Sequence, residues 1–97
     1  MGSVHGIERY RGDTYPERAT MTVDGAPLDL SGKTVRMHVY AGSEIVIDGE
    51  VADAAAGKVE FSMADVSTLD KDRYTFEIKV DDGTYVTTFL REILEIK

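Results

Sequence analysis

The 97-residue sequence contains no cysteine and no tryptophan, and it has only two prolines. Without cysteine, a disulfide scaffold, a thiolate metal site and a cysteine nucleophile are excluded. No stretch approaches the roughly 20 apolar residues that a membrane-spanning helix needs. The first six residues have neither a basic region nor an apolar run, so we expect no secretion signal. These absences predict a soluble protein and fit assembly in a reducing cytoplasm.

Positive charge is also scarce. The chain has 11 Lys and Arg against 18 Asp and Glu, which gives a net charge of −7. The basic residues are scattered, whereas binding to a phosphate backbone needs clustered positive charge, so nucleic acid is not an expected partner. A hydrophobic content of 42% is enough for one core, and 97 residues are too few for two. We therefore expect a single domain over residues 1–97, with residues 1–6 flexible.

Alternation of apolar and polar side chains with a period of two is the strongest local pattern. It is clearest at residues 34–40, 58–63 and 73–80, where apolar groups would cover one face of a strand and polar groups the other. Less regular runs predict further strands at 7–10, 19–23, 44–47, 84–90 and 93–96. The run at 7–10 would form an edge of the sheet, and a bend near Arg91-Glu92 would separate the runs at 84–90 and 93–96.

Residue pairs that contain glycine divide these runs. Glycine supplies the positive φ that tight turns need, so each pair predicts a turn, and the clearest hairpin is expected at Asp82-Gly83. About seven short strands with turns roughly every 8–12 residues are typical of an antiparallel β-sandwich. Residues 64–69 predict one helical turn, in which Val66 and Leu69 would close one end of the sandwich. The glycine pairs are Asp24-Gly25, Ser31-Gly32, Ala41-Gly42, Asp48-Gly49, Ala56-Gly57 and Asp82-Gly83.

Side chains that could bind a metal do not form a recognisable motif. His38 falls on the polar side of its strand and His5 lies near the N-terminus, and neither has converging ligands at a suitable spacing. Carboxylates gather at turns but lack the spacing of an EF-hand. We interpret them as caps of backbone N–H groups, with a weak calcium site as the alternative. The carboxylates in question are Asp48, Glu50, Asp53, Asp70, Asp72, Asp81 and Asp82.

Catalytic patterns are missing as well. The sequence shows no Ser-His-Asp arrangement, no nucleophile elbow and no glycine-rich phosphate loop. A carboxylate pair for glycoside hydrolysis needs only proximity in space, so the sequence leaves it open. A sandwich of this size, however, has little room for the pocket that such chemistry uses. We therefore expect no enzymatic activity and assign no catalytic, cofactor-binding or metal-binding residues.

The tripeptide Arg11-Gly12-Asp13 matches an integrin-recognition sequence. That meaning requires display on a loop of an extracellular animal protein, and no other feature of the sequence supports such a setting. A charged turn is the favoured interpretation. Residues 10–15 combine Arg, Asp and Tyr in a stretch with little function in the core, which makes the segment a weak candidate for an interaction surface.

Four blocks of sequence follow one another in a distinctive order. They are RGDT at 11–14, DGAPLDLSGKTV at 24–35, AGKVEF at 56–61 and DRYTFEI at 72–78. With these blocks, the chain resembles the immunoglobulin-like N-terminal domain of phage baseplate upper proteins over nearly its whole length. In the second block, Leu28 and Leu30 would point into the core and Asp29 outward. Asp72-Arg73 replaces the usual Ala-Gly, and the long C-terminal region of those proteins has no counterpart.

The resemblance implies an all-β, immunoglobulin-like antiparallel β-sandwich and a non-enzymatic structural protein of a bacteriophage virion. Its place could be the tail, baseplate, neck or a capsid accessory position. The implied partners are other virion proteins and further copies in a homo-oligomer, without nucleic acid, membrane or cofactor, after synthesis in the host bacterial cytoplasm. The alternative is a carbohydrate-binding or adhesin-type module of the same fold. Its platform candidates would be Tyr10, Tyr15 and Tyr40, with Tyr74 and Tyr85 assigned to strands.

Overall fold

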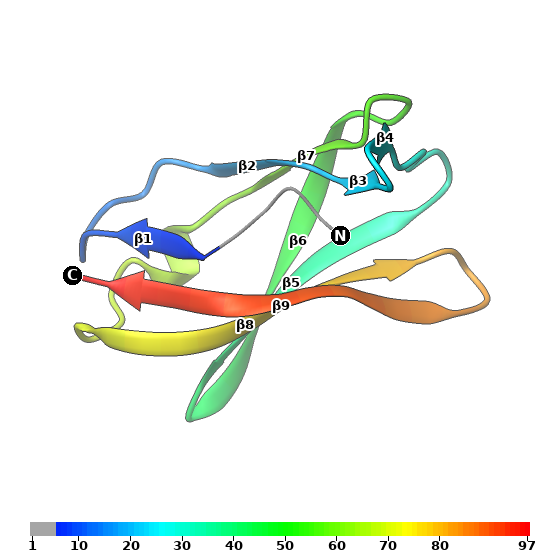
Figure 1. Cartoon of the computed structure of the whole chain (residues 1–97). Helices are drawn as coiled ribbons and strands as arrows, with labels where there is room; N and C mark the ends of the chain where they lie inside the picture. The colour runs from blue at the N-terminus through cyan, green and yellow to red at the C-terminus, as the bar shows by residue number, and fades with distance from the viewer. Residues whose placement is uncertain (1–5) are drawn as a thin grey trace.

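A computed structural model describes residues 6–97, in which one long sheet curls into two facing layers (Figure 1). Its strand order is β1-β9-β8-β5-β6-β7-β2, and β3 and β4 form a small separate hairpin. The expected all-β sandwich of about seven strands with a short helical turn is confirmed. Residues 1–5 lie outside the described residues. They include His5 and all but the last residue of the segment expected to be flexible. The elements are β1 (Ile7–Arg9), β2 (Glu17–Thr20), β3 (Thr22–Val23), β4 (Ala26–Pro27), β5 (Thr34–Ala41), β6 (Ser43–Asp53), β7 (Lys58–Phe61), η1 (Ala64–Val66), β8 (Asp72–Asp81) and β9 (Val86–Ile96).

The apolar faces of the strands meet in one core between the layers. On β5, Val35, Met37 and Val39 are buried, while the residues between them are not. β8 repeats this pattern with Phe76 and Ile78. The alternation in the sequence therefore determines which face of each strand lies inside. Fully buried side chains from the rest of the fold include Met21, Leu30, Val59, Phe61, Met63, Val66 and Leu94.

Strand β6 belongs to both layers and joins them. Its first half pairs with β5, ending where Asp48 stands opposite Arg36, and its second half pairs with β7 from Gly49 onward. The prediction that this strand ends at an Asp48-Gly49 turn is therefore wrong. A Cβ on Gly49 would lie 2.8 Å from Val59 Cγ2 and 2.9 Å from Phe61 Cε1. Glycine is required here because neighbouring side chains occupy the space next to the backbone.

β1 forms one edge of the sheet, as expected for the run at 7–10, but it pairs in parallel. Ile7 stands opposite Leu94 of β9, and Arg9 stands opposite Ile96. The arrangement is therefore mixed at this edge, whereas an entirely antiparallel sandwich was expected. The hydrogen bonds continue beyond the strand, because the N–H of Lys97 donates to the carbonyl oxygen of Arg9 at 2.8 Å.

β9 is one continuous strand rather than two. The bend expected near Arg91-Glu92 is replaced by a shift in the register with β8 that leaves Phe89 as an extra residue, which is a β-bulge. The strand begins at Val86 rather than at residue 84. Tyr85 therefore lies in the turn between β8 and β9 and not in the strand to which it was assigned.

The run expected at 19–23 is divided into two strands by Met21. The N–H of Met21 donates to Gly57 O at 2.8 Å, and its carbonyl oxygen accepts the N–H of Leu28 at 2.9 Å. The next part of the chain follows the prediction. Leu30 is fully buried, Leu28 packs partly against the core, and Asp29 is exposed. The two leucines thus anchor the connection into β5 as expected.

The helical turn expected at 64–69 forms at Ala64–Val66 and leads from β7 to β8. Val66 is fully buried, and Leu69 packs partly against the core. The N–H of Leu69 donates to Val66 O at 3.2 Å, so the turn continues to Leu69, and both apolar residues that were singled out in the sequence pack against the core. Within residues 6–97, no helix is long and apolar enough to cross a membrane.

Replacing Gly49 with alanine should destabilise the fold. At a glycine without positive φ, this change ordinarily stabilises a protein by about 0.4–1 kcal/mol. Because the new methyl group would overlap Val59 and Phe61, we expect the free energy of unfolding, measured by urea denaturation, to fall by about 1–3 kcal/mol instead. Gly6→Ala is the matched control, since a Cβ there meets Ile93 O at 3.4 Å. Equal effects of the two changes would contradict this explanation.

Candidate interaction surfaces

The loop between β1 and β2 is organised around the buried side chain of Arg9. Arg9 is 2% exposed, and its Nη1 lies 2.9 Å from Oε1 of Glu17. Its Nη2 donates to the carbonyl oxygens of Asp13 and Tyr15, and its Cζ lies 3.9 Å from the centre of the Tyr15 ring. A buried guanidinium is tolerated when its donors are satisfied, so these contacts fix the loop to both strands. Sequence reasoning missed Arg9, although its spacing from Ile7 predicts the same inward face.

The Arg11-Gly12-Asp13 tripeptide is tied to the body of the protein by its backbone. The N–H of Arg11 donates to Lys97 O at 2.9 Å, and the N–H of Gly12 donates to Ser67 O at 2.7 Å. The tripeptide is therefore part of a charged turn, as expected. Tyr10 and Tyr15 beside it are 66% and 53% exposed, so this segment stays a candidate contact surface.

Polar and charged side chains pair with one another across the outer face of the sheet. The hydroxyl of Tyr40 on β5 donates to Oε1 of Glu77 on β8 at 2.6 Å. This hydrogen bond is the main reason why the pKa of Tyr40 is raised to about 12 and the pKa of Glu77 is lowered. The phenol is therefore neutral and the carboxylate is charged at neutral pH, which keeps the donor and the acceptor matched.

Several of the residues considered for metal binding have other contacts. His38 lies on the polar side of β5 as expected, and its Nδ1 lies 3.2 Å from Oε2 of Glu44. Asp53, Asp81 and Asp82 accept backbone N–H groups within their own turns, which confirms the capping interpretation for these three. Within residues 6–97, no group of three or more His, Asp or Glu side chains is placed to hold a metal ion.

The three tyrosines considered as a carbohydrate platform do not lie on one face of the sheet. Tyr10 and Tyr15 flank the loop after β1, whereas Tyr40 lies on β5, which β9 and β8 separate from β1 (Figure 1). The Tyr15 ring covers Arg9. The most exposed tyrosine is instead Tyr85, at 72%. These positions leave the proposed platform without a shared flat surface.

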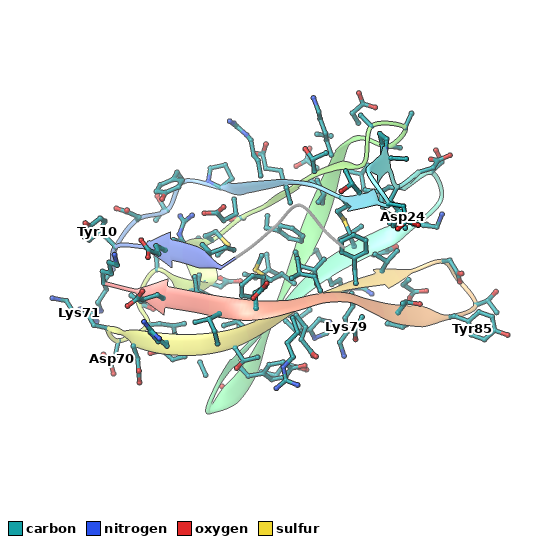
Figure 2. All side chains as sticks on the ribbon, viewed as in Figure 1. Tyr10, Asp24, Asp70, Lys71, Lys79 and Tyr85 are labelled. Atoms are coloured by element: carbon teal, nitrogen blue, oxygen red, sulfur yellow. The ribbon has the colours of Figure 1, made fainter. Side chains whose placement is uncertain are left out.

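The turn between β8 and β9 carries exposed apolar side chains. It lies at the opposite end of the molecule from Tyr10 (Figure 2). Tyr85 is 72% exposed, and Val86 is 63% exposed. Oδ1 of Asp82 accepts the N–H groups of Thr84 at 2.9 Å and of Tyr85 at 2.7 Å. The bond from Tyr85 is the main cause of a lowered pKa for Asp82, so a charged carboxylate holds this turn in one conformation.

An apolar groove of about 260 Å³ lies beside this turn. Its walls include Val23 of β3 and Leu28 after β4 on one side, and Thr87 and Phe89 of β9 on the other. Sequence reasoning missed this surface because it placed Tyr85 within a strand. The two walls are also far apart in the sequence, and only the folding of the sheet brings them together.

Comparison with known proteins supports the fold. No protein-family model matches the chain, and no curated protein matches it in sequence. Among solved structures, the N-terminal domain of phage TP901-1 ORF48 matches with a TM-score of 0.68 and 15% sequence identity, covering 92% of this chain and 83% of that chain. The resemblance to a phage domain noted in the sequence is thus confirmed at the level of the fold.

A second solved structure, a putative alpha-galactosidase from Bacteroides fragilis NCTC 9343, covers 99% of this chain and 17% of that chain. Its sequence identity is 17%, and its TM-score is 0.42. A likeness this weak does not indicate a shared fold.

Replacing Arg9 with lysine should destabilise the protein. Lysine keeps the charge but lacks the planar fork that reaches Glu17 and the loop carbonyls together. We expect the free energy of unfolding, measured by urea denaturation, to fall by about 1.5–3 kcal/mol. Arg18→Lys is the control, because the exposed pair between Arg18 and Glu60 should contribute less than about 1 kcal/mol. An equally small loss at both positions would contradict the role given to Arg9.

Replacing Tyr40 with phenylalanine should raise the pKa of Glu77 toward its ordinary value of 4.5. A carboxylate with a lowered pKa stabilises the fold above the unfolded-state value, and this contribution is lost as the pH falls through the folded-state value. The wild type and Tyr40→Phe should therefore differ in stability most at neutral pH, and the difference should shrink in acid. A carbon NMR titration of the Glu77 carboxyl group measures the shift directly, with Tyr10→Phe as the control. An unchanged titration in Tyr40→Phe would rule out this assignment.

Proposed function

We propose that this protein is a non-enzymatic structural component of a bacteriophage virion, in its tail, baseplate, neck or capsid accessory structures. The observation that carries the proposal is the fold shared with a phage protein domain over 92% of this chain. The sequence blocks at 11–14, 24–35, 56–61 and 72–78 support it independently. On this proposal residues 1–97 act as one domain.

The distribution of surface side chains supports a role in contacts between proteins. Across the sheet faces, charged groups pair with one another, as Arg36 does with Asp48 at 3.0 Å. Tyr85 and Val86 lie in and next to the β8–β9 turn, and Val23 lines the groove beside that turn, so three exposed apolar residues gather at one end. The other large apolar residues that are exposed are spread over several elements: Tyr10, Tyr15, Tyr40, Val46 and Ile93. Apolar surface gathered in one place on a small protein marks an interaction site more often than scattered apolar residues do.

On this proposal the partners are other virion proteins, and several copies of the chain enter each particle after synthesis in the host bacterial cytoplasm. Assemblies of this kind are usually built on closed symmetry, which supports the expected homo-oligomer. Nucleic acid is not among the proposed partners, because the net charge is −7 and the basic residues are scattered.

The proposal predicts that the protein is present in assembled phage particles. Particles released from cells that carry the gene would be purified on a density gradient, and their proteins would be quantified by mass spectrometry. We expect this chain at a fixed ratio to the major tail or capsid protein, while an abundant cytoplasmic host protein serves as the contamination control. Light scattering on the isolated protein then measures its oligomeric state.

Two results would contradict the proposal. The first is absence of the chain from particles that contain the products of the neighbouring genes. The second is specific binding on a glycan array by a chain that is absent from particles, which would favour the carbohydrate-binding alternative.

A further inference from the structure

The outer faces and the edge of β9 are poorly suited to docking. The faces carry ion pairs, such as the one between Arg18 and Glu60 at 3.0 Å. Their exposed apolar residues, Val46 and Ile93, lie on the separate strands β6 and β9 and form no continuous patch. The edge of β9 is interrupted by the bulge at Phe89. Glu92 of the same strand stands opposite the buried Phe76, so its side chain is on the inner side of the sheet. Bulges and inward-pointing charges oppose the addition of another strand at an edge.

The end of the sandwich that carries the β8–β9 turn is better suited to docking. Tyr85, Val86 and Val23 are 72%, 63% and 44% exposed, and the apolar groove walled by Leu28 and Phe89 lies beside them. Tyrosine is enriched among the residues that dominate binding energy at protein interfaces, and a neighbouring groove can bury a side chain of the partner in return. We call Val23, Tyr85, Val86 and the adjoining groove the apolar tip.

The β8–β9 turn of the apolar tip is closed by hydrogen bonds of its own. Besides the two bonds that Asp82 Oδ1 accepts, the N–H of Asp82 donates to Tyr85 O at 3.1 Å. The N–H of Gly83 donates to Oδ1 of Asp81 at 2.8 Å. A turn closed by four hydrogen bonds loses little conformational entropy on binding, which favours its use as a docking element.

Negative charge surrounds the apolar tip. Asp24 lies in the turn next to Val23, and Asp82 lines the groove. Asp29 follows Leu28, and hydrogen bonds from Ser31 lower its pKa, so it is charged at neutral pH. Lys33 also lines the groove, and its charge is close to both Asp29 and Asp82. This single positive charge offsets only part of the negative charge of the three aspartates.

This charge selects the kind of partner. A second copy of the chain would bring the same aspartates and a further net charge of −7, and like charges facing each other across an interface are unfavourable. A surface that is apolar at its centre and carries Lys and Arg at its rim is complementary. We propose that the apolar tip docks into an apolar pocket ringed by basic residues on a different virion protein. This inference rests on the proposed function, since it takes the partner from the virion.

The number of copies in each particle tests the location of the docking surface. In phage-producing cells the wild-type gene would be replaced by a gene for the Tyr85→Asp variant, or for Val86→Asp as a second variant. The number of protein copies in each purified particle would be measured by mass spectrometry. We expect at least a tenfold loss, because a charge would enter the apolar pocket. Tyr10→Asp tests the other candidate contact surface, at the opposite end, and on this inference its copy number should stay within twofold of the wild type. Thermal melts of the isolated variants confirm that each one folds.

The outcomes separate the two levels of the proposal. If wild-type protein enters particles and both tip variants enter equally well, the docking inference is overturned and the proposed function stands. A loss in Tyr10→Asp alone would move the docking surface to the loop after β1. If wild-type protein is absent from particles, the proposed function fails, and the docking inference fails with it.

Photo-crosslinking tests the identity of the occupant. Position 85 would carry p-benzoylphenylalanine in assembling particles, with the same group at position 10 as the control. We expect position 85 to cross-link to a different virion protein, at a site with Lys or Arg nearby. A cross-link between two copies of this chain would overturn the choice of partner, as would a site without basic residues.

Charge-neutral variants test the role of the aspartates. Asp24→Asn together with Asp82→Asn removes two charges and keeps an oxygen that can cap the turn. We expect a severalfold fall in the number of copies per particle. Asp65→Asn together with Asp70→Asn is the matched control, because Asp70 lies at the opposite end (Figure 2). Equal copy numbers for the two double variants would show that charge does not select the partner.

Discussion

The sandwich depends on the passage of β6 from one layer to the other at a point where there is no space for a side chain. At Gly49 the strand exchanges β5 for β7 as its partner, and Val59 and Phe61 of β7 pack directly against its backbone. Because one strand serves both layers, the core is continuous from the β8 side to the β7 side. The same closeness explains why Phe61 is fully buried near the middle of the fold. A residue larger than glycine would push the two layers apart where they are joined.

On the open side of the sandwich, the side chain of Arg9 connects the two ends of the curled sheet. The two ends of the curled sheet, β1 and β2, are not hydrogen-bonded to each other, and the chain between them must cross from one to the other. Arg9 spans this opening, with its guanidinium inside the molecule and its donors directed to Glu17 and to loop carbonyls. The free-energy cost of removing the Arg9 charge from water is offset because the guanidinium donates hydrogen bonds to several acceptors. The loop after β1 is therefore ordered by one buried ion together with the backbone hydrogen bonds of Arg11 and Gly12, rather than by an apolar cluster.

Local patterns predicted the strands whose alternation is regular, and they predicted the helical turn and the placement of Leu28, Asp29 and Leu30. Their failures have physical reasons. An Asp-Gly pair fits a tight turn and also fits a close approach of side chains. Only the packing of Val59 and Phe61, which lie on the next strand, distinguishes the two at Gly49. The parallel pairing of β1 depends on partners almost 90 residues away. Tyr85 has strong strand propensity, but the cap from Asp82 keeps it in the turn. The apolar tip combines residues next to two separate turns that no local pattern connects.

The parallel pairing of β1 with β9 has a mechanical consequence. Tension applied at the two ends of the chain would pull the start of β1 and the end of β9 in opposite directions along parallel strands. The hydrogen bonds between these strands, together with those that Lys97 makes with Arg9 and Arg11, would then be loaded at the same time in shear. Bonds arranged this way must break together, whereas the bonds of a hairpin pulled from its open end separate one after another. The edge of the sheet thus acts as a clamp against stretching along the chain.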